Sequence, residues 1–527
     1  MEQLNKVLPE AQEDKHPALV KALEEKKESP MLIKVRSNFG FFGGISMIFG
    51  TFFAILFYKA GTGLNVFLFT LLLVFLLILV SKKLSVIIRT GTKYYYTGAI
   101  LLALSSTLTS SYVLQFLNII GILLLLDLSL LHQFYEDRSW EFTRHFFRMI
   151  GLVFQSIASI GMPFVDCIGF MKHTKLFKND KTRNVFLGTL ISLPFLLLVT
   201  TLLSSADLLF GKMTKNMVDT IFSADIFTIL FMIIFGFLAC YCIICGTVGK
   251  AGLPDKKAGT KADASIAITF MTLLLLVYAV FCGIQIVYLF ANGVFVLPEE
   301  FTFAEYARRG FFELLTVTVV NIGLILLCKS FFQESKVLRG IITCFTLCTY
   351  ILIASATYRM LLYIGAYHLT FLRLFVLLSL LIITLVLTGI LIAEYKKSFP
   401  LFAYCVAVTS VCYILFSFSK PDYFIASYLT EHVDVLDKSD VAYLVYDLSL
   451  DAAPVVISAL EDERLIEADK SNDTQNNDSS NILESADKDL RLEYYMRINS
   501  NAKIRRWKDF NYSVSRAKKL AKEYPIS

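Results

Sequence analysis

The run FLRLFVLLSLLIITLVLTGILIA, which occupies residues 371–393, is apolar throughout except for one charged residue, Arg373, and a few small polar ones. At about 1.5 Å of rise per residue, a helix of this length spans the roughly 30 Å hydrocarbon core of a bilayer. A backbone in lipid must satisfy its hydrogen bonds internally, and the run lacks the apolar–polar alternation of a barrel strand. It therefore predicts a transmembrane helix.

Similar runs recur along most of the chain. Their lengths are about 18–25 residues, as a membrane crossing requires, and they begin near Phe39, Thr62, Tyr96, Val113, Asn184, Asp225, Ile266, Gly310, Val337, Phe371 and Phe399. The composition agrees, because 56% of the residues are hydrophobic, more than is usual in a soluble domain. We expect an all-α polytopic membrane helix bundle of about eleven transmembrane helices within residues 39–418.

The segments outside these runs are more polar. Residues 1–38 are charged throughout, which predicts an uncleaved cytoplasmic segment. Residues 419–527 predict a small, mainly helical domain, with helix-like stretches at 442–460 and 490–520 and a flexible loop near 470–480 that is rich in Asn, Asp and Ser. Residues 141–175 are amphipathic and predict a helix in the membrane interface, with partner docking as the alternative.

Lys and Arg gather in alternate connections between the runs, which indicates the orientation. Members of this basic set include Lys82, Arg144, Lys257, Lys336 and Lys397. The positive-inside rule makes these connections cytoplasmic, and an odd number of crossings then places the C-terminal domain outside. We expect a multi-pass plasma-membrane protein with a cytoplasmic N-terminus and an extracytoplasmic C-terminus. Because this placement explains the net charge of +6, we predict no nucleic-acid partner.

Motifs for cofactors and common enzymatic reactions are absent. The sequence has no nucleophile elbow, Walker loop, zinc-ligand pair or dinucleotide fingerprint, so we predict no cofactor. Cys240, Cys242 and Cys245 have metal-like spacing, but on a helix they fan over roughly 140°, and we predict no metal there. Asp127 lies between Leu126 and Leu128. An acid inside an apolar run suggests proton coupling or pairing.

Polar residues also gather at the predicted outer ends of the runs. We name as the outer rim Asp207, Gln285, Tyr288, Glu305, Arg308, Arg309, Arg359 and Arg373. One interpretation is that they are interfacial anchors and helix-end pairs. The other is an anion site for a phosphate- or carboxylate-bearing ligand, because guanidinium groups bind such anions bidentately. Under this second interpretation, Arg373 points into the bundle and contacts Gln285, Glu305 or Glu313.

Short motifs in and beyond the rim suggest a family. They are Ser205-Ala206-Asp207, Gln285-x-x-Tyr288-Leu289-Phe290, Ala304-Glu305-Tyr306-Ala307-Arg308-Arg309-Gly310-Phe311-Phe312, Ser355 through Arg359-Met360-x-x-Tyr363 to Leu369-Thr370-x-x-Arg373, Leu448-Ser449-x-Asp451-Ala452-x-Pro454 and Phe510-Asn511. With them the chain resembles, from about residue 184 to 520, a family of multi-spanning membrane proteins found mainly in Firmicutes and defined only as a domain of unknown function. His368 stands where that family is expected to have glycine. The resemblance implies a helical bundle in a Gram-positive plasma membrane, and no reaction.

Two classes of function remain open on the sequence. The first is a non-enzymatic envelope transporter or sensor partner, which works in the lipid bilayer and meets an envelope ligand or another protein. The alternative is a membrane-embedded transferase or ligase for a lipid-linked or phosphate-bearing envelope precursor, with the rim arginines holding phosphate and Glu305 or Asp207 as base. A purely structural scaffold is a third possibility.

Overall fold

The computed structural model describes residues 29–137, 140–173, 224–252, 260–290, 311–432, 438–461, 483–504 and 506–523, with isolated residues between 185 and 213. Within these ranges the regular elements are helices, and none is a β-strand, which confirms the prediction of an all-α fold. The chain divides into two compact units. The first comprises residues 1–54, 78–87 and 151–256, and the second residues 55–77, 88–150 and 257–527.

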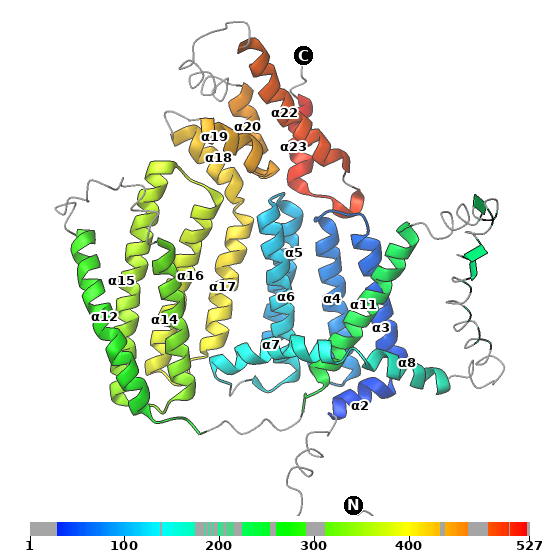
Figure 1. The fold of residues 1–527 in the computed structure, drawn as a ribbon, viewed down its shortest axis with the longest axis horizontal. Coiled ribbons are helices and arrows are strands. Elements are labelled where there is room, and N and C mark those ends of the chain that lie inside the picture. Colours follow the sequence, from blue (N-terminus) through cyan, green and yellow to red (C-terminus); the bar gives the residue numbers. More distant parts are fainter. Residues whose placement is uncertain are drawn as a thin grey trace, which may run out of the picture. The chain divides into compact units, whose positions relative to one another are not determined.

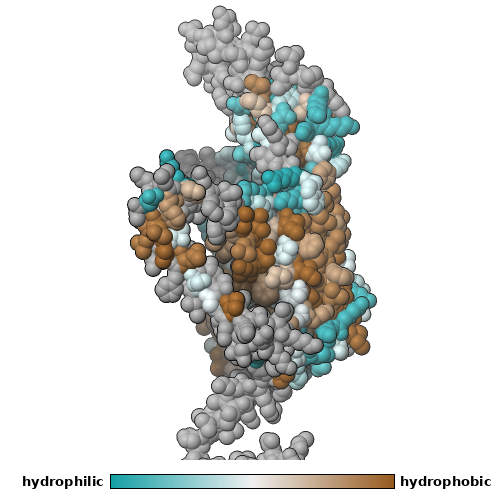
Figure 2. All heavy atoms as spheres, turned by 90° about the vertical axis from the view of Figure 1, so that its right-hand side faces the viewer, coloured by the Kyte–Doolittle hydropathy of each residue, from teal (hydrophilic) through white to brown (hydrophobic). Residues whose placement is uncertain are grey.

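Nine of the described helices are long and apolar enough to cross a membrane. They are α3 (Phe39–Phe57), α4 (Leu64–Lys83), α6 (Tyr112–Phe134), α11 (Ala224–Val248), α12 (Ala264–Phe290), α14 (Phe311–Phe331), α15 (Lys336–Tyr367), α16 (Phe371–Tyr395) and α17 (Leu401–Phe418). They coincide with nine of the eleven predicted runs, and Figure 2 shows hydrophobic side chains gathered in a broad band between hydrophilic ones. A multi-pass membrane protein is therefore confirmed.

The other two predicted runs have different outcomes. The run near Asn184 lies almost wholly outside the described residues. The run near Tyr96 is α5 (Thr90–Leu108), a helix that is less apolar than the nine but packs closely along α6 (Figure 1). Ser105 and Ser106 are fully buried in it, so its polar groups are accommodated by protein and not by lipid. Two further helix pairs are bent by 47° and 102° and raise the number of candidate spans to at most eleven.

The segment predicted to lie in the membrane interface forms α7 (Phe142–Ala158) and α8 (Met162–His173). Figure 1 shows the first half of α7 lying across the axes of α5 and α6. Phe146 and Phe147 are exposed on it, whereas His145 is buried. This amphipathic pattern and direction support the interfacial prediction, which the structure, having no membrane, leaves as a prediction. In the first unit, α8 contributes Asp166, which pairs with Arg36 at 2.9 Å and accepts a hydrogen bond from Tyr241.

The C-terminal domain, which belongs to the second unit, is helical, and its core includes residues from the membrane helices beside it. Its elements are α18 (Pro421–His432), α19 (Lys438–Ala442), the π-helical turn η2 (Tyr443–Asp447), the 3₁₀ turn η3 (Leu450–Ala452), α20 (Ala453–Glu461), α22 (Leu483–Ile504), the 3₁₀ turn η4 (Trp507–Asp509) and α23 (Tyr512–Glu523). Leu444, Val456 and Ile498 are fully buried in this core, which also includes Leu369 from the α15–α16 connection. The predicted loop at 470–480 lies outside the described residues.

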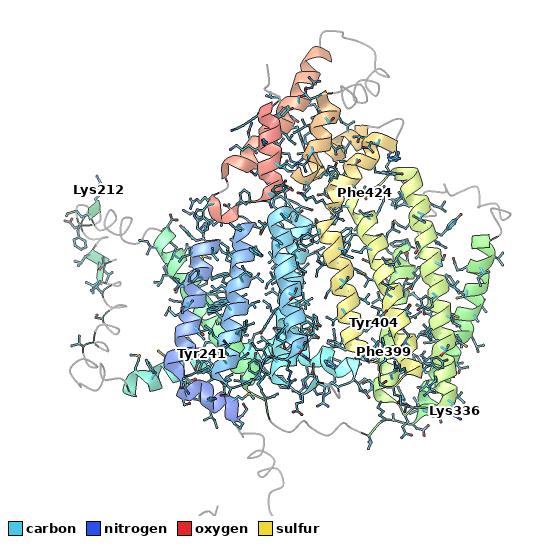
Figure 3. The ribbon with its side chains drawn as sticks, turned by 180° about the vertical axis from the view of Figure 1, so that it is seen from behind. Lys212, Tyr241, Lys336, Phe399, Tyr404 and Phe424 are labelled. Carbon is cyan, nitrogen blue, oxygen red and sulfur yellow. The ribbon has the colours of Figure 1, made fainter. Side chains whose placement is uncertain are left out.

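Two ends of the second unit are used as reference points below. The domain end is where α5 finishes and α6 begins, beside the C-terminal domain (Figure 1). The pocket end is where α6, α14 and α16 finish and α15 and α17 begin. In Figure 3, Phe424 lies near the domain end and Lys336 lies near the pocket end. Phe399 and Tyr404 pack near the pocket end, with ring centroids 5.2 Å apart.

The domain end is held by buried polar contacts, which we name the C-terminal seam. Asp451, only 3% exposed, accepts hydrogen bonds from the Thr109 hydroxyl at 2.5 Å and from the Ser110 amide at 2.8 Å and hydroxyl at 3.0 Å. Asn511 donates to the carbonyl of Thr109 at 2.6 Å. The α5–α6 connection is therefore bonded to the C-terminal domain through two residues, Asp451 and Asn511, which satisfy the Ser110 amide and the Thr109 carbonyl.

A second part of the C-terminal seam binds the α3–α4 connection. Lys508 donates to the carbonyls of Ile55 and Tyr58 at 3.0 and 2.5 Å, at the C-terminal end of α3, where a helix favours a cation. Asp509 accepts from the amide of Gly61. A Cβ at Gly63 would lie 2.4 Å from the carbonyl oxygen of Phe510, so this close approach requires glycine.

His368, which stands where the resembled family is expected to have glycine, has an unusual backbone. It follows α15 with φ 61°, in the left-handed region that favours glycine. Its ring Nδ1 lies 2.8 Å from Oδ2 of Asp440. The contact with the C-terminal domain offsets part of the cost of this conformation.

Candidate functional site

The three outer-rim residues of the second unit whose side chains are described, Gln285, Arg359 and Arg373, fall into two groups at the domain end. In the first, the Ser355 hydroxyl donates to Oε1 of Gln285 at 2.6 Å, and Nη2 of Arg359 lies 3.5 Å from the same oxygen. Gln285 and Ser355 are buried. An amide deep in an apolar run thus has polar partners on a neighbouring helix, as the cost of burying it requires.

Arg373 forms the second group. It donates to the carbonyls of Tyr367 and His368 at the end of α15. Its guanidinium also lies over the rings of Tyr363 at 4.3 Å and Tyr367 at 5.9 Å. Its partners in the described chain are thus carbonyls and aromatic rings. Arg373 therefore caps the α15–α16 connection, as cations do at helix C-termini. The expected contact with Gln285, Glu305 or Glu313 stays a prediction, since Glu305 lies outside the described residues.

The remaining predicted site residues are covered only in part. Oδ1 of Asp207, in the first unit, accepts from the amide of Phe210 at 2.7 Å. Tyr288 lies in α12, but its side chain is outside the description, as are Glu305, Arg308 and Arg309. The expected convergence of the whole rim stays a prediction.

Two further sequence hypotheses have clearer placements. Oδ2 of Asp127 has no hydrogen-bond partner in α6 or elsewhere in the described chain. Cys242 and Cys245 are buried as free thiols, and Cys240 is partly buried. The described residues contain no group of three His, Cys, Asp or Glu side chains arranged to hold a metal ion.

Inside the second unit, a polar cluster joins three helices near their midpoints. The Tyr278 hydroxyl in α12 donates to Oδ1 of Asn321 in α14 at 2.8 Å, and Nδ2 of Asn321 donates to the Thr349 hydroxyl in α15 at 3.1 Å. Asn321 and Thr349 are fully buried. We name these three residues the middle layer. Since α15 packs against α12, α14 and α16, this layer lies inside the group that these helices form.

A pocket of about 820 Å³ lies at the pocket end of the second unit. Its wall is built from six segments: Tyr95 of α5, the end of α6 with the α6–α7 connection and the start of α7, residue Lys261, the end of α14 with the α14–α15 connection and the start of α15, the end of α16, and the start of α17 with the connection before it. Most of its charges are paired across these segments. Lys261 lies 2.8 Å from Glu141, and Glu394 lies 2.9 Å from Lys329 and 3.6 Å from Arg339.

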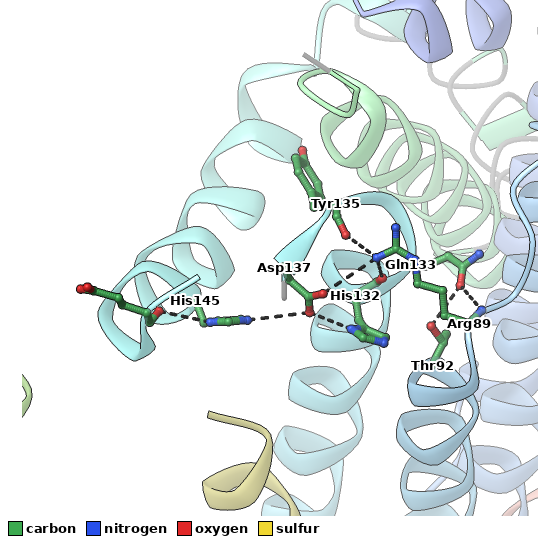
Figure 4. A network of polar contacts seen from close by, with 8 residues as sticks. Arg89, Thr92, His132, Gln133, Tyr135, Asp137 and His145 are labelled. Carbon is green, nitrogen blue, oxygen red and sulfur yellow. Dashed lines mark hydrogen bonds and ion pairs between the residues drawn. The ribbon is translucent and has the colours of Figure 1, made fainter. Parts of the chain in front are cut away.

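Asp137, a largely buried acid of this pocket, lies between two histidines (Figure 4). Nδ1 of His132 is 2.7 Å from Oδ2 of Asp137, and Nε2 of His145 is 3.7 Å from the same oxygen. Burial alone raises the pKa of Asp137, but the hydrogen bonds and charges of the two histidines outweigh it and hold this pKa well below its usual range. Arg89 Nη1 lies 3.9 Å from Oδ1 of Asp137.

Aromatic rings fix the second histidine in place. The His145 ring stacks on Phe402 with centroids 4.1 Å apart and meets the edge of Trp140 at 5.3 Å. Arg144 and Arg148 of α7 lie over the Trp140 ring at 5.3 and 5.4 Å. The His145 ring is thus held by packing as well as by hydrogen bonds.

Sequence reasoning did not identify this pocket. Its basic residues belong to the connections that we interpreted as signals of orientation, and each connection alone looks ordinary. A usable signal was present, since two of the six histidines of the chain, His132 at the end of α6 and His145 at the start of α7, flank Asp137 in the sequence. Histidines that share an acid are typical of proton-binding sites.

Comparison with known proteins gives a family. The model of a domain of unknown function, DUF4153, matches residues 96–459, more than half of the chain. This range contains the pocket, the middle layer and Asp451. It begins earlier than the motif resemblance and ends before Phe510-Asn511. No curated protein and no solved structure matches the chain. The chain belongs to the family defined by the domain of unknown function DUF4153.

Proposed function

We propose that the protein is a transporter, and that a small polar solute passes through the group formed by α12, α14, α15 and α16. The observation that carries this proposal is the middle layer. Asn321 is the central residue of α14, and Tyr278 and Thr349 lie near the centres of α12 and α15. Secondary transporters bind substrate near the bilayer midplane, and polar side chains that face a bundle interior mark such pathways.

Polar groups also lie at both ends of the same helices. Along α15, Ser355 and Arg359 form the layer at the domain end, Thr349 the middle layer, and Arg339 a layer at the pocket. At about 1.5 Å per residue, these levels are about 9 and 15 Å apart. Phe345 and Leu352, both fully buried, fill the space between them. A solute can pass only if the helices move, as alternating access requires.

The pocket supports a polar solute that carries both charges. Its wall presents Lys261, Lys329, Arg339 and Lys397 together with Glu141, Glu334, Glu394 and Asp137. A wall with balanced charge favours a zwitterionic or neutral polar molecule over a simple anion. A volume of about 820 Å³ is ample for one such molecule. On the predicted orientation, the pocket opens to the cytoplasm.

The transferase alternative receives less support. It needs rim arginines that are available to hold a phosphate. Arg373 instead donates to two backbone carbonyls and stacks on two tyrosines, and Arg359 contacts Gln285. These contacts favour a structural role at helix ends.

A vesicle experiment tests the transport proposal. Proteoliposomes that contain the full chain, and empty liposomes, are incubated with a defined mixture of amino acids, organic acids, sugars and sugar phosphates, and their contents are measured by mass spectrometry. We expect at least one zwitterionic or neutral polar solute to accumulate only with the protein. Equal contents for every solute would contradict the proposal, and uptake of a simple anion alone would contradict the assignment of solute class.

A further inference from the structure

We propose that Nε2 of His145 is a proton-binding site in the pocket, and that solute transport is coupled to proton movement through it. The coupling rests on the proposed transport function. The proton site itself rests on the geometry of His145, Asp137 and Glu141.

The hydrogen bonds of His145 determine which ring nitrogen carries the proton. Nδ1 of His145 lies 3.2 Å from the carbonyl oxygen of Glu141. A carbonyl only accepts, so Nδ1 must donate. In the neutral ring, Nε2 then has a lone pair and no proton, and it faces Oδ2 of Asp137 at 3.7 Å. Two acceptors therefore face each other across a buried gap.

His132 differs in this respect. Its Nδ1 lies 2.7 Å from Oδ2 of Asp137 and donates to it in the neutral ring. Its Nε2 points toward Gly91, where an added Cβ would lie 2.3 Å away. The neutral form of His132 therefore already fits its surroundings. Of the two histidines, His145 is the one whose neutral form is mismatched with the acid.

A proton on Nε2 of His145 replaces this mismatch with an ion pair. The side chains of His145 and Asp137 are only 10% and 12% exposed, so their attraction is weakly screened by solvent. The stacked ring of Phe402 also favours a cation. The proton comes from solution through the pocket, which His145 lines, and it leaves by the same nitrogen.

The other charged groups around the pocket are largely neutralised by one another. Lys261 pairs with Glu141, Lys397 with Glu334, and Glu394 with both Lys329 and Arg339. Arg144 and Arg148 lie over Trp140, and Arg89 lies 3.9 Å from Oδ1 of Asp137. Asp137 is thus the acid that contacts the ring of His145, with Arg89 partly opposing its charge.

Tryptophan fluorescence reports this proton directly. The chain has two tryptophans, Trp140 beside His145 and the exposed Trp507 in the C-terminal domain, so the variant Trp507→Phe leaves Trp140 as the only emitter. A protonated imidazole quenches an adjacent indole more strongly than a neutral one. We expect the emission of the purified full-length variant to fall as pH decreases and Nε2 of His145 takes up its proton.

Further variants in the Trp507→Phe background assign the transition. His145→Gln should remove it, whereas His132→Gln should keep it. Asp137→Asn, which retains His145, should shift its midpoint to lower pH by about one unit or more, because an adjacent carboxylate favours the charged form. Gel filtration and circular dichroism establish that each variant is folded. A transition that persists in folded His145→Gln, or that does not move in Asp137→Asn, would overturn the proton site.

Transport measurements test the coupling separately. In proteoliposomes, an imposed pH gradient should change the uptake of the identified solute by wild-type protein and leave uptake by His145→Gln unchanged. Uptake that ignores the gradient while the fluorescence transition is present would overturn the coupling alone. A fluorescence transition without uptake of any solute would overturn the transport function and leave the proton site standing.

Discussion

The C-terminal seam and the pocket are both rich in buried polar groups, yet they differ in what those groups surround. In the seam, the buried Asp451 accepts hydrogen bonds from the α5–α6 connection, and the buried Asn511 donates one to it. In the pocket, Asp137 and His145 border a volume of about 820 Å³, and one pair of facing atoms is mismatched. The comparison indicates that polar groups with all their hydrogen bonds made within the protein stabilise the fold, whereas polar groups that border a cavity remain available to bind a ligand.

The largest effect expected from this comparison is in the seam. Asp451→Ala leaves the Thr109 hydroxyl and the Ser110 amide buried without their acceptor, and should cost about 3 kcal/mol of unfolding free energy. Thermal unfolding of the purified protein in detergent measures this loss. Asp447→Ala, on an exposed side chain of the same domain, is the matched control and should behave like wild type. If the two variants unfold together, the seam does not hold the domain.

A smaller effect is expected from a substitution that crowds the His132 side chain in the pocket. Gly91→Ala places a Cβ 2.3 Å from Nε2 of His132, so the ring must shift and its contact with Asp137 is disturbed. We expect a loss of about 1–2 kcal/mol, typical of overpacking. Gly44→Ala, where an added Cβ meets nothing within 4 Å, serves as control. Equal unfolding midpoints for Gly91→Ala and the control would show that the packing of His132 against Gly91 is loose enough to accept the added methyl group.

The smallest effect has the opposite sign and depends on pH. Burial raises the pKa of Asp422, with a further increase from the charge of Asp451. An acid with a raised folded-state pKa destabilises the fold when it is ionised, so its cost is largest at neutral pH, shrinks as pH falls below that pKa, and is gone only below the ordinary pKa of Asp in the unfolded chain. Asp422→Asn should therefore unfold slightly later than wild type at neutral pH, and this advantage should shrink in acid. A variant that is less stable at every pH would show that the carboxylate of Asp422 is needed in the seam.

The sequence predicted the membrane bundle well because each crossing is encoded locally. Residues 371–393 specify a transmembrane helix without reference to any other segment. The sequence placed the start of α5 near Tyr96, six residues after its first residue Thr90. A hydropathy pattern misses this first part of the helix because its polar residues are stabilised by tertiary contacts. His368 was identified as a departure from glycine, and its positive φ gives the departure a physical meaning.

The pocket and the contacts of the rim could not be predicted in the same way. Pairs such as Lys329 with Glu394, or Ser355 with Gln285, join residues that lie far apart in the chain. Their spacing in sequence carries no information on distance in space. For Arg373, the reasoning that a guanidinium at this depth needs an acidic or amide partner did not consider the free carbonyls at the end of α15, which accept its hydrogen bonds.

The most direct test of the transport account is the rate of solute uptake by the variant Asn321→Leu. Leucine keeps a similar volume but removes the hydrogen bonds to Tyr278 and Thr349. Thr316→Val, on an exposed position of the same helix, is the control. Per amount of folded protein in proteoliposomes, we predict that Asn321→Leu slows uptake at least about tenfold, the effect of about 1.4 kcal/mol on a barrier, while the control retains the wild-type rate. Wild-type uptake by folded Asn321→Leu would contradict a pathway through the middle layer.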